Sequence, residues 1–116
     1  MKGQALKGHL DLLVLAVLDD GAKHGYAVID ALRTRSDDSF DLPEGTVYPV
    51  LHRLERAGLL ASDWSVVQGR RRRTYELTKK GRGALADQTR SWDEFTAAVG
   101  RVLGNGAGGS ASWQPT

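Results

Sequence analysis

The sequence predicts a mainly α-helical fold with one small β-hairpin. Three observations support this prediction. Apolar residues in the first half of the chain recur at steps of three and four residues, which is typical of amphipathic helices. A stretch of strand-like alternation interrupted by a tight turn comes next. A last segment returns to helical spacing and aligns large side chains along one narrow seam.

Two helices are expected at the start of the chain. The first runs from about Leu6 to Asp20 and stops at Gly21. The second runs from about His24 to Arg35, with residues 23–25 as the connection, and the polar residues 36–41 form a loop. The apolar positions of these helices are Leu6, Leu10, Leu13, Val14, Val17 and Leu18, then Tyr26, Val28, Ile29 and Leu32.

A third helix is expected from about Pro43 to Ala57, where Gly58 ends it. Its start is ambiguous because Pro49 lacks an N–H and clashes with a preceding turn. Either the regular part begins near Thr46, which puts Pro49 in the first turn, or Asp41 caps a longer helix that is kinked. The inward-facing residues are Val47, Val50, Leu51 and Leu54.

The hairpin is expected where the apolar spacing changes from helical to alternating. Trp64 and Val66 precede the turn at residues 67–70, and Thr74, Tyr75 and Leu77 follow it. The turn and the second strand hold four consecutive arginines. We therefore expect a two-stranded hairpin with a basic tip and a basic second strand.

A fourth helix of about 25 residues is expected to begin after Thr78, whose hydroxyl can cap it. At 1.5 Å per residue it would be about 37 Å long, more than a small three-helix core can cover. Dimerisation is therefore expected, although the seam can also pack on its own domain. The expected interface residues are Leu10, Leu13, Leu85, Gln88, Trp92, Phe95, Val99 and Val102.

Charge is distributed unevenly along the chain. The net charge is only +2, but residues 53–82 carry nine basic and three acidic residues, a net +6, and the remainder carries −4. A segregated positive field favours a polyanionic partner.

Composition excludes several classes of protein. Without cysteine the chain has no disulfide, thiolate metal site or thiol nucleophile, which fits a reducing cytoplasm but also fits other compartments. No apolar run is long enough to span a bilayer, and no signal-peptide pattern begins the chain. The three histidines are widely separated and no catalytic motif is present. We expect no enzyme, no metal, no cofactor and no membrane partner.

Three helices followed by a basic hairpin are the plan of a winged helix-turn-helix, in which the third helix enters the major groove of DNA and the wing reaches the neighbouring backbone or minor groove. Tyr48 can instead belong half to the core, and the arginines can simply be a solvated hairpin. Because strand side chains alternate, only some of the four arginines are expected to touch DNA. The candidate DNA-binding residues are Thr46, Tyr48, Pro49, His52, Arg53, Arg56, Arg70, Arg71, Arg72 and Arg73.

Three segments resemble the PadR family of bacterial transcriptional regulators, and the resemblance spans about Leu6 to Leu103, nearly the whole of the chain that is expected to be ordered. They are GTVYPVLHRLERAGLL at residues 45–60, GRRRRTYELTKKG at residues 69–81 and LKGHLDLLVLAVLDDGAKHGYAVIDAL at residues 6–32. The resemblance implies a homodimer that represses transcription from a palindromic operator and is released by a small molecule.

The single helix after the wing resembles the short PadR subfamily, in which a tryptophan of that helix can stack a planar aromatic ligand at the dimer interface. The resemblance assigns this role to Trp92, which can alternatively only fill the interface. Two other functions stay open: a winged-helix module that binds an acidic protein surface, and a regulator that needs no ligand.

The predicted organisation therefore has three parts. Residues 1–78 form a winged helix-turn-helix DNA-binding domain, residues 79–103 a C-terminal dimerisation helix, and residues 104–116 a disordered tail rich in glycine and alanine.

Overall fold

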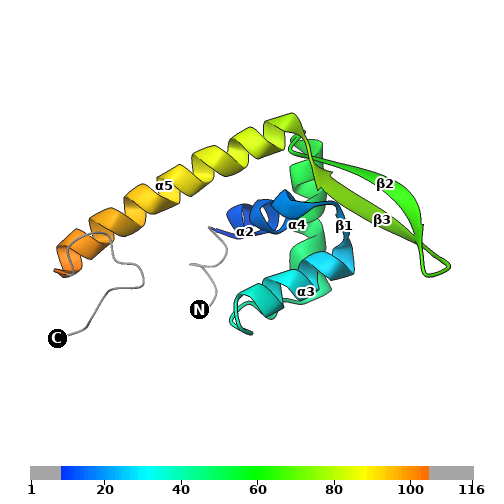
Figure 1. Ribbon diagram of the computed structural model, residues 1–116, viewed down its shortest axis with the longest axis horizontal. Helices are drawn as coiled ribbons and strands as arrows, with labels where there is room; N and C mark the ends of the chain where they lie inside the picture. The colour runs from blue at the N-terminus through cyan, green and yellow to red at the C-terminus, as the bar shows by residue number, and fades with distance from the viewer. Residues whose placement is uncertain (1–8, 105–116) are drawn as a thin grey trace. The chain divides into compact units, whose positions relative to one another are not determined.

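A computed structural model describes residues 9–104 of the chain (Figure 1). The chain divides into two compact units, one up to Leu85 and one from Ala86 onward, which we call the first and second units. The predicted helix start near Leu6 and the predicted tail beyond Gly104 lie outside the described residues. The elements are α2 (Leu10–Val17), the 3-10 turn η1 (Leu18–Asp20), β1 (Lys23–His24), α3 (Gly25–Arg35), α4 (Glu44–Arg56), β2 (Leu60–Val67), β3 (Arg70–Leu77) and α5 (Lys79–Leu103).

The mainly helical fold with a small sheet agrees with the prediction. α2 buries one of its sides, and η1 continues the chain for one further turn. Gly21, the residue predicted to stop this helix, ends the segment with a φ of 146°. α3 begins after His24, whose Nδ1 accepts a 3.3 Å hydrogen bond from the N–H of Ala27. An imidazole that caps a helix in this way must carry no proton on Nδ1, because a protonated nitrogen cannot accept a hydrogen bond.

α4 begins differently from either predicted alternative. Pro43 is the extended N-cap residue, and its carbonyl accepts the N–H groups of Thr46 and Val47, so Asp41 does not cap the helix. Because the helix starts at Glu44, Pro49 lies in the second turn rather than the first. The C-terminus follows the prediction, since Gly58 has a φ of 82° and the next N–H bonds back to the last turn of the helix.

The hairpin forms as predicted, but the sheet has a third strand. Gln68 and Gly69 both have positive φ, of 53° and 77°, which is the geometry of a type I′ turn. The sheet order is β1-β3-β2, and β1 pairs antiparallel with β3 through Lys23 opposite Tyr75 and His24 opposite Thr74. Two paired residues are too few to show an alternating pattern, so the sequence indicated only a connection there.

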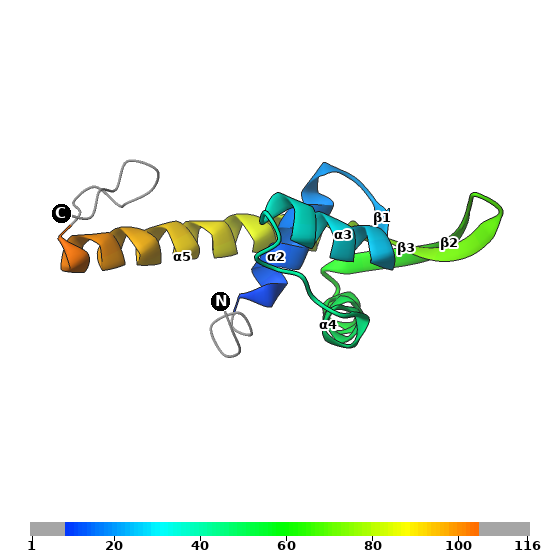
Figure 2. The ribbon, with the colours of Figure 1, turned by 90° about the horizontal axis from the view of Figure 1, so that it is seen from below.

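The core of the first unit joins α2, α3, α4 and the inner half of the sheet. Tyr75 is the largest buried side chain, and the wing beyond it projects away from the helices of this unit (Figures 1 and 2). Each fully buried aliphatic side chain contributes about 1.5–3 kcal/mol to folding. The side chains that are fully buried with Tyr75 are Leu15, Leu51, Leu54, Val14, Val28 and Val47.

The predicted cap of α5 is present. Oγ1 of Thr78 accepts a 3.0 Å bond from the N–H of Gly81 and donates a 2.7 Å bond to the carbonyl of Gly58. Ala84 and Leu85 then pack against the core of the first unit. The two hydrogen bonds of Thr78 therefore hold the first turns of α5 against the end of α4.

Candidate nucleic-acid interface

One stripe of α4 faces solvent. Gly45, Pro49, His52, Arg53 and Arg56 are all exposed, and their spacing of four, three, one and three residues puts them on one side of the helix. The opposite side carries the four buried aliphatic residues that the sequence predicted. Four of the six candidate DNA-binding residues predicted on this helix therefore share its exposed side.

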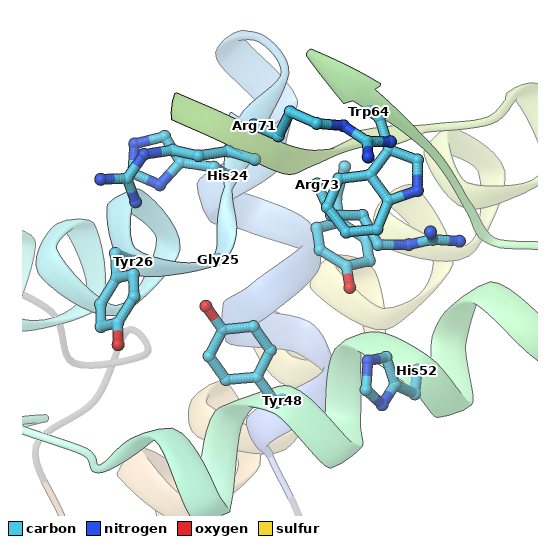
Figure 3. A pocket seen from close by; sticks show the side chains of 10 residues that line it. His24, Gly25, Tyr26, Tyr48, His52, Trp64, Arg71 and Arg73 are labelled. Carbon is cyan, nitrogen blue, oxygen red and sulfur yellow. The ribbon is translucent and has the colours of Figure 1, made fainter. Parts of the chain in front are cut away.

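The two other candidates on α4, Thr46 and Tyr48, are half-buried. Figure 3 shows the hydroxyl of Tyr48 directed toward Gly25, and the ring stands edge-on to Tyr26 with a centroid separation of 6.2 Å. Burial raises the pKa of the Tyr48 phenol. Tyr48 therefore belongs in part to the core, the second of the two interpretations that the sequence allowed.

Arg53 is held by a residue of another helix. Its two terminal nitrogens donate to the carboxylate of Asp11 on α2 at 2.8 and 2.6 Å. This bidentate pair raises the pKa of the Arg53 guanidinium above its ordinary value. Both side chains remain partly exposed, so a DNA contact by Arg53 would have to share or replace this carboxylate.

The wing arginines alternate between the two faces of the hairpin. Arg73 pairs with Trp64 across the strands and Arg71 lies two residues along on the same face, with their guanidinium carbons 5.5 and 4.7 Å from the Trp64 ring centroid. Arg72 reaches instead to Tyr26, 5.9 Å from its centroid. Arg70 is exposed next to the turn.

Glu55 of α4 connects the helix to the base of the wing. Its carboxylate lies 3.6 Å from the Arg73 guanidinium and accepts a 2.6 Å bond from the hydroxyl of Ser62. Arg73 is therefore partly neutralised within the protein.

A pocket of about 310 Å³ lies among α4, the start of α3 and the wing (Figure 3). Five of the ten candidate DNA-binding residues meet at this pocket, and the other five, Thr46, Pro49, Arg53, Arg56 and Arg70, lie outside it. The lining residues are His24, Gly25, Tyr26, Tyr48, His52, Trp64, Arg71, Arg72, Arg73 and Tyr75.

Sequence reasoning missed four side chains of the pocket: His24, Tyr26, Trp64 and Tyr75. For Trp64 the signal was available, because a two-residue turn at Gln68 and Gly69 fixes Trp64 opposite Arg73. For Tyr26, which donates a 2.8 Å hydrogen bond to Glu44, no sequence signal connects the two residues. The pKa of His24 is lowered by burial and by the nearby charge of Arg72.

The predicted dimer residues fall in both units. Leu10 is only 5% exposed in the core of the first unit, and Leu13 and Leu85 pack partly against that core. In the second unit Gln88 and Val99 are half-buried, whereas Trp92, Phe95 and Val102 are exposed. The rings of Trp92 and Phe95 lie 6.0 Å apart at an angle of 39°.

Two properties of the described residues bear on other functions. No helix in residues 9–104 is long and apolar enough to cross a membrane. In the same residues, no three His, Asp or Glu side chains come together as a potential metal site.

Comparison with known proteins identifies the family. The model of the transcriptional regulator PadR-like family matches residues 14–87, which include α3, α4 and the wing. The chain belongs to this family. PadR regulators are non-enzymatic DNA-binding proteins, and dimerisation is typical of them.

Relatives of the PadR chain agree with this assignment. A transcriptional regulator of Mycobacterium tuberculosis is 40% identical over 91 residues, which cover 75% of this chain and 82% of the relative. A PadR family transcription regulator from Clostridium difficile is similar in structure, with a TM-score of 0.73, 31% identity and coverage of 84% and 100%. One from Eggerthella lenta has a TM-score of 0.74, 31% identity and coverage of 87% for both chains.

Proposed function

We propose that this PadR protein is a homodimeric repressor that binds a palindromic operator and leaves it when a small molecule binds. The observation that carries the proposal is one shared surface of the first unit. There His52, from the exposed stripe of α4, lines the same pocket as Arg71, Arg72 and Arg73 of the wing. Guanidinium and imidazole groups are among those that contact phosphates and base edges.

In this proposal α4 enters the major groove and the wing contacts the neighbouring backbone. Pro49, His52 and Arg56 extend from the exposed side of the helix, and the wing supplies positive charge beyond it. Since the protein would act on chromosomal DNA, the proposal also includes a cytoplasmic location.

The dimer would use the seam of α5 and would bind two half-sites about one helical turn apart. Exposed apolar side chains support it, because Phe95 is 58%, Leu103 67% and Val102 86% exposed in the second unit. Contiguous exposed apolar surface is typical of an interaction site.

The effector would be a planar aromatic molecule that stacks on Trp92, whose ring lies near that of Phe95. Quenching of Trp92 fluorescence by flat aromatic compounds would test this in a variant without Trp113. Loss of quenching in Trp92→Phe would support the site, whereas unchanged quenching in that variant would contradict it.

The experiment that tests the proposed function is fluorescence anisotropy with a labelled duplex from upstream of the protein's own gene and a scrambled duplex, at several salt concentrations. We expect the upstream duplex to bind at least about a hundredfold more tightly, about 2.7 kcal/mol. Both duplexes should show a steep salt dependence, because phosphate contacts release counterions.

A matched pair of variants locates the surface. Arg56→Ala, on the exposed side of α4, should weaken binding, and Arg35→Ala, on α3 beside Asp20, should not. Equal binding to both duplexes would contradict operator recognition. An absence of binding at low salt would favour the protein-interaction module instead.

A further inference from the structure

Three of the four wing arginines already lie against an aromatic ring of the protein itself. A long arginine side chain normally loses rotamer freedom when it binds a phosphate, and that loss weakens binding. Arg71, Arg72 and Arg73 each lie within cation–π distance of an aromatic ring. Two of these three contacts involve the same residue, Trp64.

The hairpin register explains why one ring meets two cations. Trp64 is the direct cross-strand partner of Arg73, and Arg71 is its diagonal neighbour on the same face. The two-residue turn allows no slippage, since a shift by one residue would move the ring to the other face. Tryptophan is also the side chain with the strongest cation–π attraction.

Trp64 contributes little to the core. Its side chain is 52% exposed, and it is absent from the buried cluster that holds the first unit together. It lies instead at the pocket, with Arg71 and Arg73 beside it and with Tyr48 and His52 on the α4 side (Figure 3). A large exposed ring in this position needs another explanation than burial.

We propose that Trp64 is a positioning residue, which holds the guanidinium groups of Arg71 and Arg73 ready for DNA phosphates. The inference rests on the proposed DNA-binding function and assigns to Trp64 a role that acts through the two arginines. Arg73 has a second anchor in Glu55, 3.6 Å away. Arg71 therefore depends more on the ring than Arg73 does.

The test is a series of variants at position 64 in the full-length protein, measured by duplex anisotropy over a range of salt. Trp64→Leu keeps an apolar side chain but removes the ring, and should weaken binding about tenfold, as expected for two exposed cation–π contacts. The affinities of Trp64→Phe and Trp64→Tyr should lie between those of the wild-type protein and Trp64→Leu. Because no charge is lost, the slope of log affinity against log salt should not change, whereas Arg71→Ala should reduce it.

Two controls separate positioning from a general effect. In an Arg71→Ala/Arg73→Ala background, Trp64→Leu should cause no further loss of affinity. The side-chain protons of Arg71 and Arg73 should also show upfield NMR shifts from the indole ring in the DNA-free protein, and Trp64→Leu should abolish them. The Phe variant gives the same comparison if the Leu variant is poorly folded.

The outcomes distinguish this inference from the proposed function. If the wild-type protein binds the duplex and Trp64→Leu binds equally well, Trp64 has no positioning role and the function stands. A Trp64 effect that persists without the two arginines would also overturn the inference. If the wild-type protein binds no duplex even at low salt, the proposed function fails, and the inference with it.

Discussion

Gly25 begins α3 beside the ring of Tyr48, where a side chain cannot fit. A Cβ atom on Gly25 would lie 2.5 Å from Cε1 and Cζ of Tyr48, well inside van der Waals contact. The ring is also packed against Tyr26, so it cannot move aside freely. The smallest residue in the pocket therefore sets how closely α3 approaches α4.

Gly25→Ala should destabilise the fold by about 1–3 kcal/mol, the usual cost of forcing extra volume into a packed site. Gly45→Ala is the matched control, because nothing lies within 4 Å of a Cβ atom there. In a helix this change should be neutral or stabilising by up to about 1 kcal/mol. Urea unfolding followed by circular dichroism measures both, and equal stabilities would contradict the steric argument.

His24 should make stability depend on pH. Burial and Arg72 lower its pKa below the ordinary value of 6.5, so the unfolded chain binds more protons in the window just below that value. The contribution of His24 to the free energy of unfolding is therefore fully present above about pH 6.5, and it is lost as the pH falls through the folded-state pKa.

The measurement is the thermal midpoint from about pH 7.5 to about pH 5.5. His24→Asn keeps a side-chain acceptor for the N–H of Ala27 but cannot titrate, so its midpoint should fall less over this range. A parallel decrease in both proteins would assign the pH dependence to other groups.

At the scale of elements, the junction between α4 and α5 depends on a few polar contacts. Thr78 caps α5 and bonds the carbonyl of Gly58, and Nζ of Lys80 donates to the carbonyl of Ala57 at 3.0 Å. These bonds satisfy carbonyl groups that the end of α4 leaves without helical partners. One short segment thus ends one helix and starts another.

Thr78→Ala should cost about 1 kcal/mol or more, the typical value for a lost N-cap. Thr96→Ala is the control on the same helix, because its hydroxyl bonds only a carbonyl within α5 and is solvent-exposed. Thr96→Ala should change the free energy of unfolding by no more than about 0.5 kcal/mol. Chemical denaturation of the two variants would show the difference, and a harmless Thr78→Ala would mean that the cap is dispensable.

How well an element could be predicted depended on how local its determinants are. The wing followed from its turn residues and alternation, and the end of α4 followed from Gly58, whose positive φ suits glycine. The start of α4 was predicted to within one residue, but its cap was not, because the extended Pro43 serves as the N-cap residue without a side-chain acceptor and leaves no cap motif in the sequence. The pocket could not be predicted, since it needs the packing of α3 against α4 through Tyr26, Tyr48 and Gly25.

At the scale of the whole molecule, the proposed dimer makes the clearest prediction. Phe95→Glu would put a charge on the apolar seam of α5, so the protein should shift from dimer to monomer in sedimentation experiments at micromolar concentration. The affinity for the operator should fall as well, because a dimer that contacts two linked half-sites binds far more tightly than a monomer that contacts one.

Arg101→Glu changes the charge on the side of α5 away from the seam and should leave the dimer intact. If wild-type protein sediments as a monomer, the dimer proposal fails regardless of the variants.

The bidentate pair between Asp11 and Arg53 has a consequence for the search along a chromosome. A genome offers a vast excess of unrelated sites, and the phosphates of every such site bind a basic protein non-specifically. A carboxylate at the edge of the proposed DNA-facing surface repels those phosphates wherever no compensating contact forms. Asp11 would thus shorten the time that the protein spends on wrong sequences, at some cost in affinity for the right one.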